Sequence, residues 1–430
     1  MADNLTVRFY NVRFGDAILV TVPDRSPTTG KTTLRRILID VGNAPKVASP
    51  EGGDDTVFEA VIEDILETLD GKTLDLYVMT HEHLDHVQGL PFAGMKLHPD
   101  DFKERFKVRR VWLTASAAPD YYDRFENARK QKLAFEAMHR RLARHLAAEA
   151  PPGGHGLLEL LANNDPTKTK QCVDFLRQLN PAKTRYLHRG VSLAGAHLFK
   201  EAKFEIWAPE EDTSDYYGHF QPLAFGDGGA GPLPDGAPAA AVVGATPAGA
   251  ARAGAATAAR ATAAAASTIP AARPGAQVPP AGVDVGAFLN LMRARRNGIA
   301  DNLLAIDRAA NNTSIVFLLE WRGWRLLFPG DAEIRSWKTM AKHGVLKPVH
   351  FLKVAHHGSH NGTPDGEIFD AILPAASHDG RNRLAAVSTW TDTYSGIPHT
   401  PTDERIKQRA ELFSILDDKD ELFFDLEFPG

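Results

Sequence analysis

Cysteine is almost missing from this sequence of 430 residues, which has only Cys172. A single cysteine excludes an internal disulfide and is typical of a reducing compartment, so we expect a cytoplasmic protein. It also means that any metal site has to be built from histidine and carboxylate side chains.

Long apolar runs and an excess of basic residues are also missing. No stretch is apolar for long enough to span a bilayer, and the N-terminal residues show no basic segment followed by an apolar one. The formal net charge of -5 offers no positive field to hold a nucleic-acid backbone non-specifically. We therefore expect no membrane association, and any contact with nucleic acid has to be local.

The first eighty residues alternate between strand and helix patterns. Residues 5–12, 17–22 and 34–40 have strand patterns, and the first two are expected to be neighbours in a sheet. Apolar positions over residues 57–69 repeat at helical spacing, and residues 74–79 return to a strand pattern. The order of strand, polar loop and helix predicts the α/β class.

The same pattern resumes in the second half of the chain. Further strands are predicted over residues 191–198, 204–208, 314–320, 324–328, 349–355 and 385–390, with residues 314–328 forming a hairpin.

Two segments differ from this pattern, and we interpret both as insertions into one domain of residues 1–430. Residues 120–182 are mostly helical in pattern and are rich in charge. Residues 226–282 are rich in Ala, Gly and Pro, with few large apolar side chains to offset the entropy lost on ordering. We predict that this second segment is a flexible insertion.

The motif that carries chemistry follows the strand predicted over residues 74–79. His81, His83, Asp85 and His86 provide four potential ligands within six residues. His81 and His83 can face the same side of an extended segment and bind one ion, while Asp85 and His86 reach a second ion one turn later. The alternative is a group of surface histidines beside acidic residues, which four ligands at a strand end make improbable.

This motif resembles the signature of the metallo-β-lactamase superfamily, and other segments agree with it in order. The resemblance implies a four-layer αββα sandwich. It implies that Asp40 supports the metal loop, that Asp331 bridges two ions, and that His356 or His357 is the last ligand. The sequence alone does not choose between the two adjacent histidines, so both remain candidate metal ligands.

Within that superfamily, the chain is most similar to the metal-dependent domain of bacterial competence DNA-uptake proteins and its free-standing relatives. The likeness spans about residues 5–110 and 185–425. The matching segments are residues 11–17, 311–316, 353–359 and 397–399, with Ser388 between the last two.

The resemblance implies a zinc-dependent hydrolase that cleaves phosphodiester bonds with a metal-bound hydroxide, in nucleic acid or another phosphate ester. The candidate catalytic residues are Asp85, His357 and His399, since a histidine that is not a ligand could bind phosphate or protonate the leaving oxygen. We expect one or two zinc ions, with manganese as the other possible metal.

One departure from the superfamily concerns the middle histidine ligand. His188 is the best placed histidine for that role, and an ordinary hydrogen-bonded loop histidine is an equal interpretation. Two alternatives to the phosphodiesterase stay open. One is a hydrolase of a small ester, lactone or amide on the same fold, and the other is a non-catalytic scaffold that binds a partner through the helical insertion.

Overall fold

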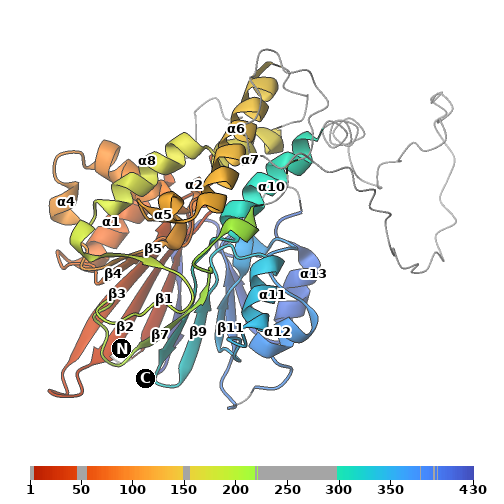
Figure 1. Ribbon diagram of the computed structural model, residues 1–430. Coiled ribbons are helices and arrows are strands. Elements are labelled where there is room, and N and C mark those ends of the chain that lie inside the picture. Colours follow the sequence, from red (N-terminus) through yellow and green to blue (C-terminus); the bar gives the residue numbers. More distant parts are fainter. Residues whose placement is uncertain are drawn as a thin grey trace, which may run out of the picture.

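The computed structural model describes residues 4–45, 56–148, 155–217, 220, 298–377, 379–390, 393–394 and 396–430. The Ala, Gly and Pro-rich segment predicted over residues 226–282 lies outside these residues. The described part forms a mixed α/β structure with two β-sheets (Figure 1). No helix among the described residues has the length and apolar character needed to cross a membrane.

The first sheet contains the N-terminal strands and the last strand of the chain. β1 pairs with β13 and with β2 in antiparallel fashion, whereas β3, β4, β5 and β6 run parallel. The strands lie in the order β13 (Phe423–Phe428), β1 (Leu5–Tyr10), β2 (Ala17–Arg25), β3 (Thr32–Val41), β4 (Leu76–Val78), β5 (Val111–Thr114) and β6 (Thr184–Leu187).

The second sheet is built from the C-terminal half of the chain and one earlier strand. β9, β10, β11 and β12 run parallel, and the β8 and β9 pair forms the predicted antiparallel hairpin. The order is β12 (Glu411–Ser414), β11 (Leu384–Val387), β10 (Phe351–Lys353), β9 (Trp324–Phe328), β8 (Val316–Trp321) and β7 (Lys203–Ala208).

The two sheets face one another across a shared apolar cluster. Val7 and Phe9 from the first sheet share this cluster with Phe317 and Phe351 from the second. The rings of Phe9 and Phe351 lie 6.1 Å apart between centroids, so the contact crosses from sheet to sheet. Because side chains alternate along a strand, Leu318 and Leu352 of the second sheet face outward, and they too are buried.

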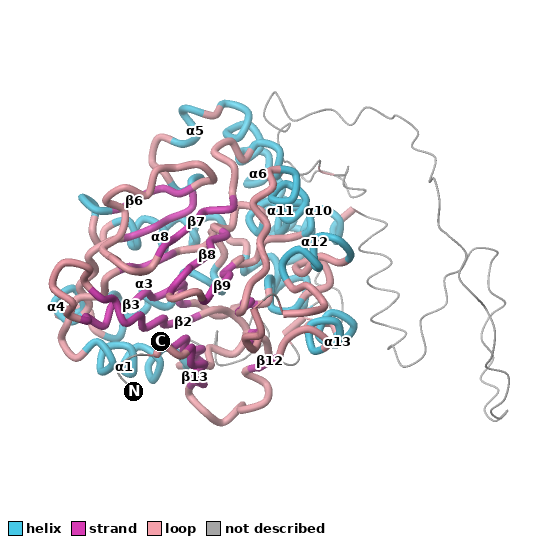
Figure 2. Tube along the Cα trace, turned by 90° about the horizontal axis from the view of Figure 1, so that it is seen from below, coloured by secondary structure: helices cyan, strands magenta, loops and turns pink. Residues whose placement is uncertain are grey.

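Helices cover the outer face of each sheet. Phe58 of α1 (Val57–Leu69) and Val173 of α8 (Pro166–Arg177) pack against the first sheet. Trp337 of α11 (Ile334–Lys342), Phe369 of α12 (Gly366–Ile372) and Ile406 of α13 (Thr400–Lys407) pack against the second. Figure 1 shows these two groups of helices on opposite sides of the sheets, and Figure 2 shows the strands at the centre of the molecule.

A third group of helices forms its own apolar cluster beside the sheets. It joins α6 (Glu126–Ala148), α7 (His155–Asn163) and α10 (Ile299–Asn311) through residues such as Leu142, Leu161 and Leu303. The remaining short helices are α2 (Leu84–Val87), α3 (Gly89–Phe92), α4 (Phe102–Arg105) and α5 (Tyr121–Arg124).

Most predicted elements are present, including the helix over residues 57–69, and one prediction is wrong. Residues 191–198 form no strand; they belong to the loop between β6 and β7, in which Ala196 and Phe199 are buried. The apolar residues that suggested a strand fill the core from a loop. A buried loop needs no hydrogen-bonded neighbouring strand, so an apolar pattern alone does not prove a strand.

Candidate metal centre

Four loops from the two sheets meet at one edge of the molecule. Asp40 ends β3, His81 follows β4, Asp331 follows β9 and His357 follows β10. Since β3 and β4 are parallel in one sheet and β9 and β10 are parallel in the other, their carboxyl ends share that edge. Residues from opposite ends of the chain, such as Asp40 and His357, are thereby brought together.

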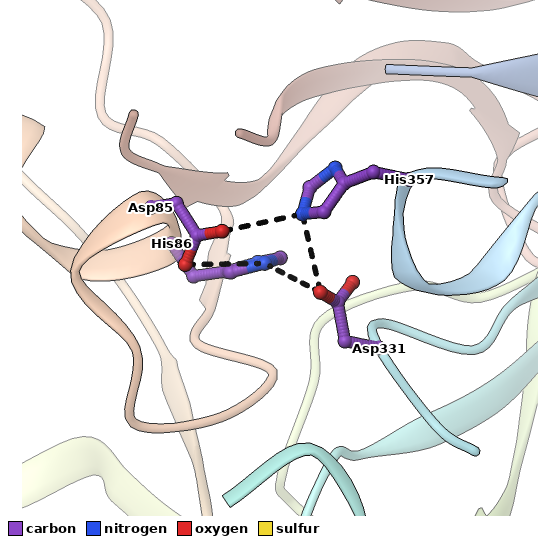
Figure 3. Close-up of side chains that lie close together, drawn as sticks. All are labelled: Asp85, His86, Asp331 and His357. Carbon is purple, nitrogen blue, oxygen red and sulfur yellow. Dashed lines mark ion pairs between the residues drawn. The ribbon is translucent and has the colours of Figure 1, made fainter. Parts of the chain in front are cut away.

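Asp85, His86, Asp331 and His357 form a buried quartet at this edge (Figure 3). The Oδ2 atom of Asp331 lies 3.3 Å from Nε2 of His86 and 3.1 Å from Nε2 of His357. Oδ2 of Asp85 lies 3.4 Å from the same nitrogen of His357. One ligand atom from each of the four residues lies within 4.8 Å of the others, which is the spacing that a metal ion requires.

The second nitrogen of each imidazole in the quartet is already engaged. Nδ1 of His86 donates to Asp40 at 2.9 Å, and Nδ1 of His357 donates to the backbone oxygen of Ser388 at 2.8 Å. These bonds direct Nε2 of both rings into the quartet, where neither nitrogen has a hydrogen-bond partner. Such an arrangement, with Nδ1 held by an outer acceptor and Nε2 free, is what a metal-binding histidine shows.

Electrostatic interactions within the quartet are strong because all four groups are buried. Burial alone lowers the pKa of His357, but Asp331 and Asp85 raise it to about 9. Burial likewise opposes the charged form of His86, yet Asp331 and Asp85 hold its pKa well above its usual range. Without metal, protons therefore occupy the positions that a cation would take.

Lys353 orients the shared carboxylate from the other side. Its Nζ lies 3.3 Å from Oδ1 of Asp331 and forms an ion pair with Asp16. Burial lowers the pKa of Lys353, but these two carboxylates outweigh that effect and its pKa is raised. Asp331 thus presents Oδ1 to lysine and Oδ2 to both imidazoles.

His81 and His83 lie beside the quartet but bond to one another. Nε2 of His81 is 3.1 Å from Nδ1 of His83, and the ring of His81 lies against that of His86, with centroids 4.2 Å apart. Burial lowers the pKa of His81 far below its usual value, so this imidazole is neutral. In the described part of the chain, neither residue belongs to a group of three or more donors within 4.8 Å.

Two residues that the sequence interpretation missed hold the loop of residues 81–86 in place. Asn163, at the end of α7, accepts a bond from the backbone N–H of Asp85 at 3.1 Å and donates to its Oδ1 at 2.9 Å. The next residue, Asn164, bonds through Oδ1 to Nε2 of His83 at 2.8 Å. No sequence signal indicated this role, because Asn beside Asp165 looks like an ordinary helix boundary.

The adjacent histidines occupy different surroundings. Both His356 and His357 have left-handed backbone, with φ of 50° and 52°. The two rings diverge, with centroids 6.4 Å apart. His357 joins the quartet, whereas His356 lies with Asp307 and Glu333.

The two other candidate histidines are not members of the quartet, although the backbone N–H of His399 donates to the oxygen of Gly358, next to His357, at 2.8 Å. His399 precedes α13 and its Nδ1 pairs with the hydroxyl of Thr402 at 2.9 Å, while its ring lies 6.0 Å from that of His360. His188 bonds through Nδ1 to the backbone oxygen of Arg189 at 2.9 Å, as a loop histidine does.

A cavity of about 240 Å³ opens over the quartet. Asp85, Asp331 and His83 form part of its wall. Arg308, His360 and Asn361 contribute polar groups, and the apolar part of the lining comes from Phe14, Leu160, Leu304, Tyr394 and Ile397. The cavity joins a buried set of ligands to a space that a small molecule can enter.

Comparison with known families and curated proteins identifies no relative of this chain. Neither the models of known protein families nor the curated protein sequences give a match to this chain. The fold and the site therefore define a mixed α/β protein with a buried group of histidines and aspartates that could bind a metal ion.

Proposed function

We propose that this chain is a zinc-dependent hydrolase with the metallo-β-lactamase fold, and that its substrates are phosphodiesters. One observation carries the proposal. The Nε2 atoms of His86 and His357 are buried, lack hydrogen-bond partners and point at the same oxygen of Asp331. Two sheets packed face to face, with helices on both outer faces, are the layers that such a sandwich requires.

The residues present fit a metal ion. Neutral imidazole and carboxylate are the ligands that zinc accepts when cysteine is absent, and manganese accepts the same set. Asp85, His86, Asp331 and His357 would hold the ion. When bound, it supplies the positive charge that activates water and offsets the negative charge developing on the attacked group.

The surrounding residues fix the ligands before any ion arrives. Asn163 holds Oδ1 of Asp85, and Lys353 holds Oδ1 of Asp331. The remaining oxygen of each carboxylate faces His357. Groups that are held in advance need little reorganisation during a reaction, and this supports a catalytic role over a purely structural one.

The lining of the cavity favours an anionic ester as the substrate. Arg308 and Asn361 can donate hydrogen bonds to phosphoryl oxygens, and a charged donor such as arginine binds phosphate strongly. The apolar wall formed by Phe14, Leu160 and Ile397 suits the organic part of a diester. The same wall would also accept a small ester, lactone or amide, which remains the second candidate.

The test is to assay the metal-loaded protein on bis(p-nitrophenyl) phosphate, single-stranded DNA, a p-nitrophenyl ester and a chromogenic β-lactam. We expect turnover of the phosphodiesters, its loss with a chelator or with Asp331→Asn, and no loss with the surface variant Asp420→Asn. Turnover of only the carboxylic ester or the lactam would favour the second candidate. Metal binding without any turnover would favour a non-catalytic scaffold.

A further inference from the structure

A second group of potential ligands lies along the same cavity, separate from the quartet. Asp307 of α10, Glu333 before α11 and His356 place one ligand atom each within 4.8 Å of the others, and we call them the α10 cluster. Nε2 of His356 lies 3.9 Å from Oδ2 of Asp307, and its Nδ1 lies 3.7 Å from Oε1 of Glu333. Each ring nitrogen therefore faces one carboxylate.

The α10 cluster concentrates negative charge in a buried place. Asp307 is 7% exposed and Glu333 is 5% exposed. Arg308 comes within 3.9 Å of Glu333, but its side chain is 53% exposed and much of its charge is screened by water. Burial of two carboxylates side by side is costly unless a positive charge compensates them.

Asn311 supplies an independent indication of a missing ligand. This fully buried side chain directs Nδ2 at all three members of the α10 cluster, at 3.1 Å from Asp307, 3.0 Å from Glu333 and 3.2 Å from His356. An amide nitrogen has two hydrogens, so it cannot satisfy three acceptors fully. Its oxygen Oδ1 and Nδ1 of His356 are both buried without a hydrogen-bond partner.

Rotation of the Asn311 amide would bring its oxygen, which now has no hydrogen-bond partner, to the α10 cluster. The two ends of an amide have nearly the same shape, and their assignment follows the surrounding hydrogen bonds. With a cation present, the favoured orientation would turn Oδ1 toward Asp307, Glu333 and His356. Four acceptors would then surround one point, and a positive ion can satisfy them together.

We propose that the α10 cluster, with the amide oxygen of Asn311, is a binding site for a second divalent cation. Two carboxylates, one imidazole and one amide oxygen are a mixed set that suits manganese or zinc. Asp307 and His356 line the same cavity as Asp85 and Asp331, so an ion here faces whatever that cavity binds. The inference concerns binding alone and does not require that the protein is a hydrolase.

The experiment counts bound manganese in the full chain. Protein stripped with a chelator is reloaded with Mn²⁺, desalted and analysed for metal by mass spectrometry. A titration followed by electron paramagnetic resonance gives the affinity of each site. The variants are Glu333→Gln, Asp307→Asn, Asp331→Asn and, as a control, Glu367→Gln, which removes an exposed acid from α12.

We expect Glu333→Gln and Asp307→Asn each to lose one equivalent, or to bind it at least tenfold more weakly. Asp331→Asn should lose only the equivalent that belongs to the quartet, and Glu367→Gln should match the unaltered chain. Unchanged stoichiometry and affinity in Glu333→Gln and Asp307→Asn would overturn the proposal. If circular dichroism shows that one of these two variants does not fold, the metal content of the other variant tests the proposal.

These results also separate the proposal from the hydrolase function. Loss of one equivalent in Glu333→Gln without phosphodiester turnover in the unaltered chain would keep the α10 site and remove the hydrolase. Phosphodiester turnover, together with equal metal content in Glu333→Gln and the unaltered chain, would keep the hydrolase and remove the α10 site.

Discussion

Asp40 accepts a hydrogen bond from Nδ1 of His86 at 2.9 Å, and this contact links the end of β3 to the metal loop. Asp40 also accepts bonds from the backbone N–H and the hydroxyl of Thr80, at 2.8 and 2.6 Å. One carboxylate therefore fixes both the beginning of the loop and the ring orientation of a candidate ligand. Burial raises the pKa of Asp40, although His86 opposes that rise.

We predict that Asp40→Asn lowers zinc affinity by roughly 10- to 100-fold, because an outer acceptor of a ligating histidine sets its orientation and basicity. Zinc titration against a competing chelator measures the change. Asp420→Asn, an exposed acid, serves as the control. Equal zinc affinity in Asp40→Asn and the unaltered chain would contradict the role given to Asp40.

Asn163 is expected to act by positioning Asp85. In Asn163→Ala both bonds to Asp85 are lost, so zinc affinity should fall by about tenfold. Asn180 makes a matched control, since its amide also makes two hydrogen bonds, to the backbone oxygens of Val108 and Arg109, neither of which is a candidate ligand. If both variants lose stability equally and neither loses zinc affinity, the role of Asn163 is structural.

The metal-free protein should lose stability as the pH rises. The pKa of His357 in the folded chain is about 9, above its ordinary value of 6.5, because of Asp331 and Asp85. The stabilising proton is fully bound below about pH 6.5 and is lost as the pH approaches 9. We expect the free energy of unfolding to fall by on the order of 3 kcal/mol across that range.

Urea denaturation in the presence of a chelator, at about pH 6 and about pH 9.5, measures this fall. Asp331→Asn should reduce it, because that variant removes the main cause of the raised pKa. Zinc competes with the same proton, so zinc affinity should rise with pH over the same interval. A stability that is flat, or that rises, across this range without metal would rule out the ion pairs described for the quartet.

Gly330, just before Asp331, packs closely against Thr80 and Ser314. Its φ is +55°, and an added Cβ would lie 2.9 Å from Cβ of Thr80 and 3.1 Å from that of Ser314. Gly344 has a similar φ of +64° with open space around it. Ala at either position has the left-handed penalty of about 1 kcal/mol, but Ala at 330 also has to displace its neighbours.

We therefore predict that Gly330→Ala lowers the free energy of unfolding by about 1 to 3 kcal/mol more than Gly344→Ala does. It should also weaken zinc binding, because Asp331 is the next residue. Urea denaturation and zinc titration of both variants provide the comparison. An equal loss of unfolding free energy in the two variants would mean that Thr80 and Ser314 move aside at little energetic cost.

Several features of the fold follow from local pattern. Alternating apolar residues along the first strands and the helical repeat over residues 57–69 predicted those elements, because burial on one face imposes its period on the sequence. The strand predicted over residues 191–198 failed for the converse reason. Its apolar residues are buried although they lie in a loop. An apolar pattern does not show whether the backbone that bears it is a strand or a loop.

The cluster from His81 to His86 could be recognised because four potential ligands stand close together after one strand. The sequence also determined the types of ligand available, since a chain with one cysteine has only imidazole and carboxylate to offer. Their grouping was decided by tertiary structure. Two left-handed residues in succession separate His356 from His357, and the packing of α7 and α10 brings Asn163 and Asp307 to the cavity. Contacts between residues so distant in sequence depend on how sheets and helices pack, and no local spacing encodes that packing.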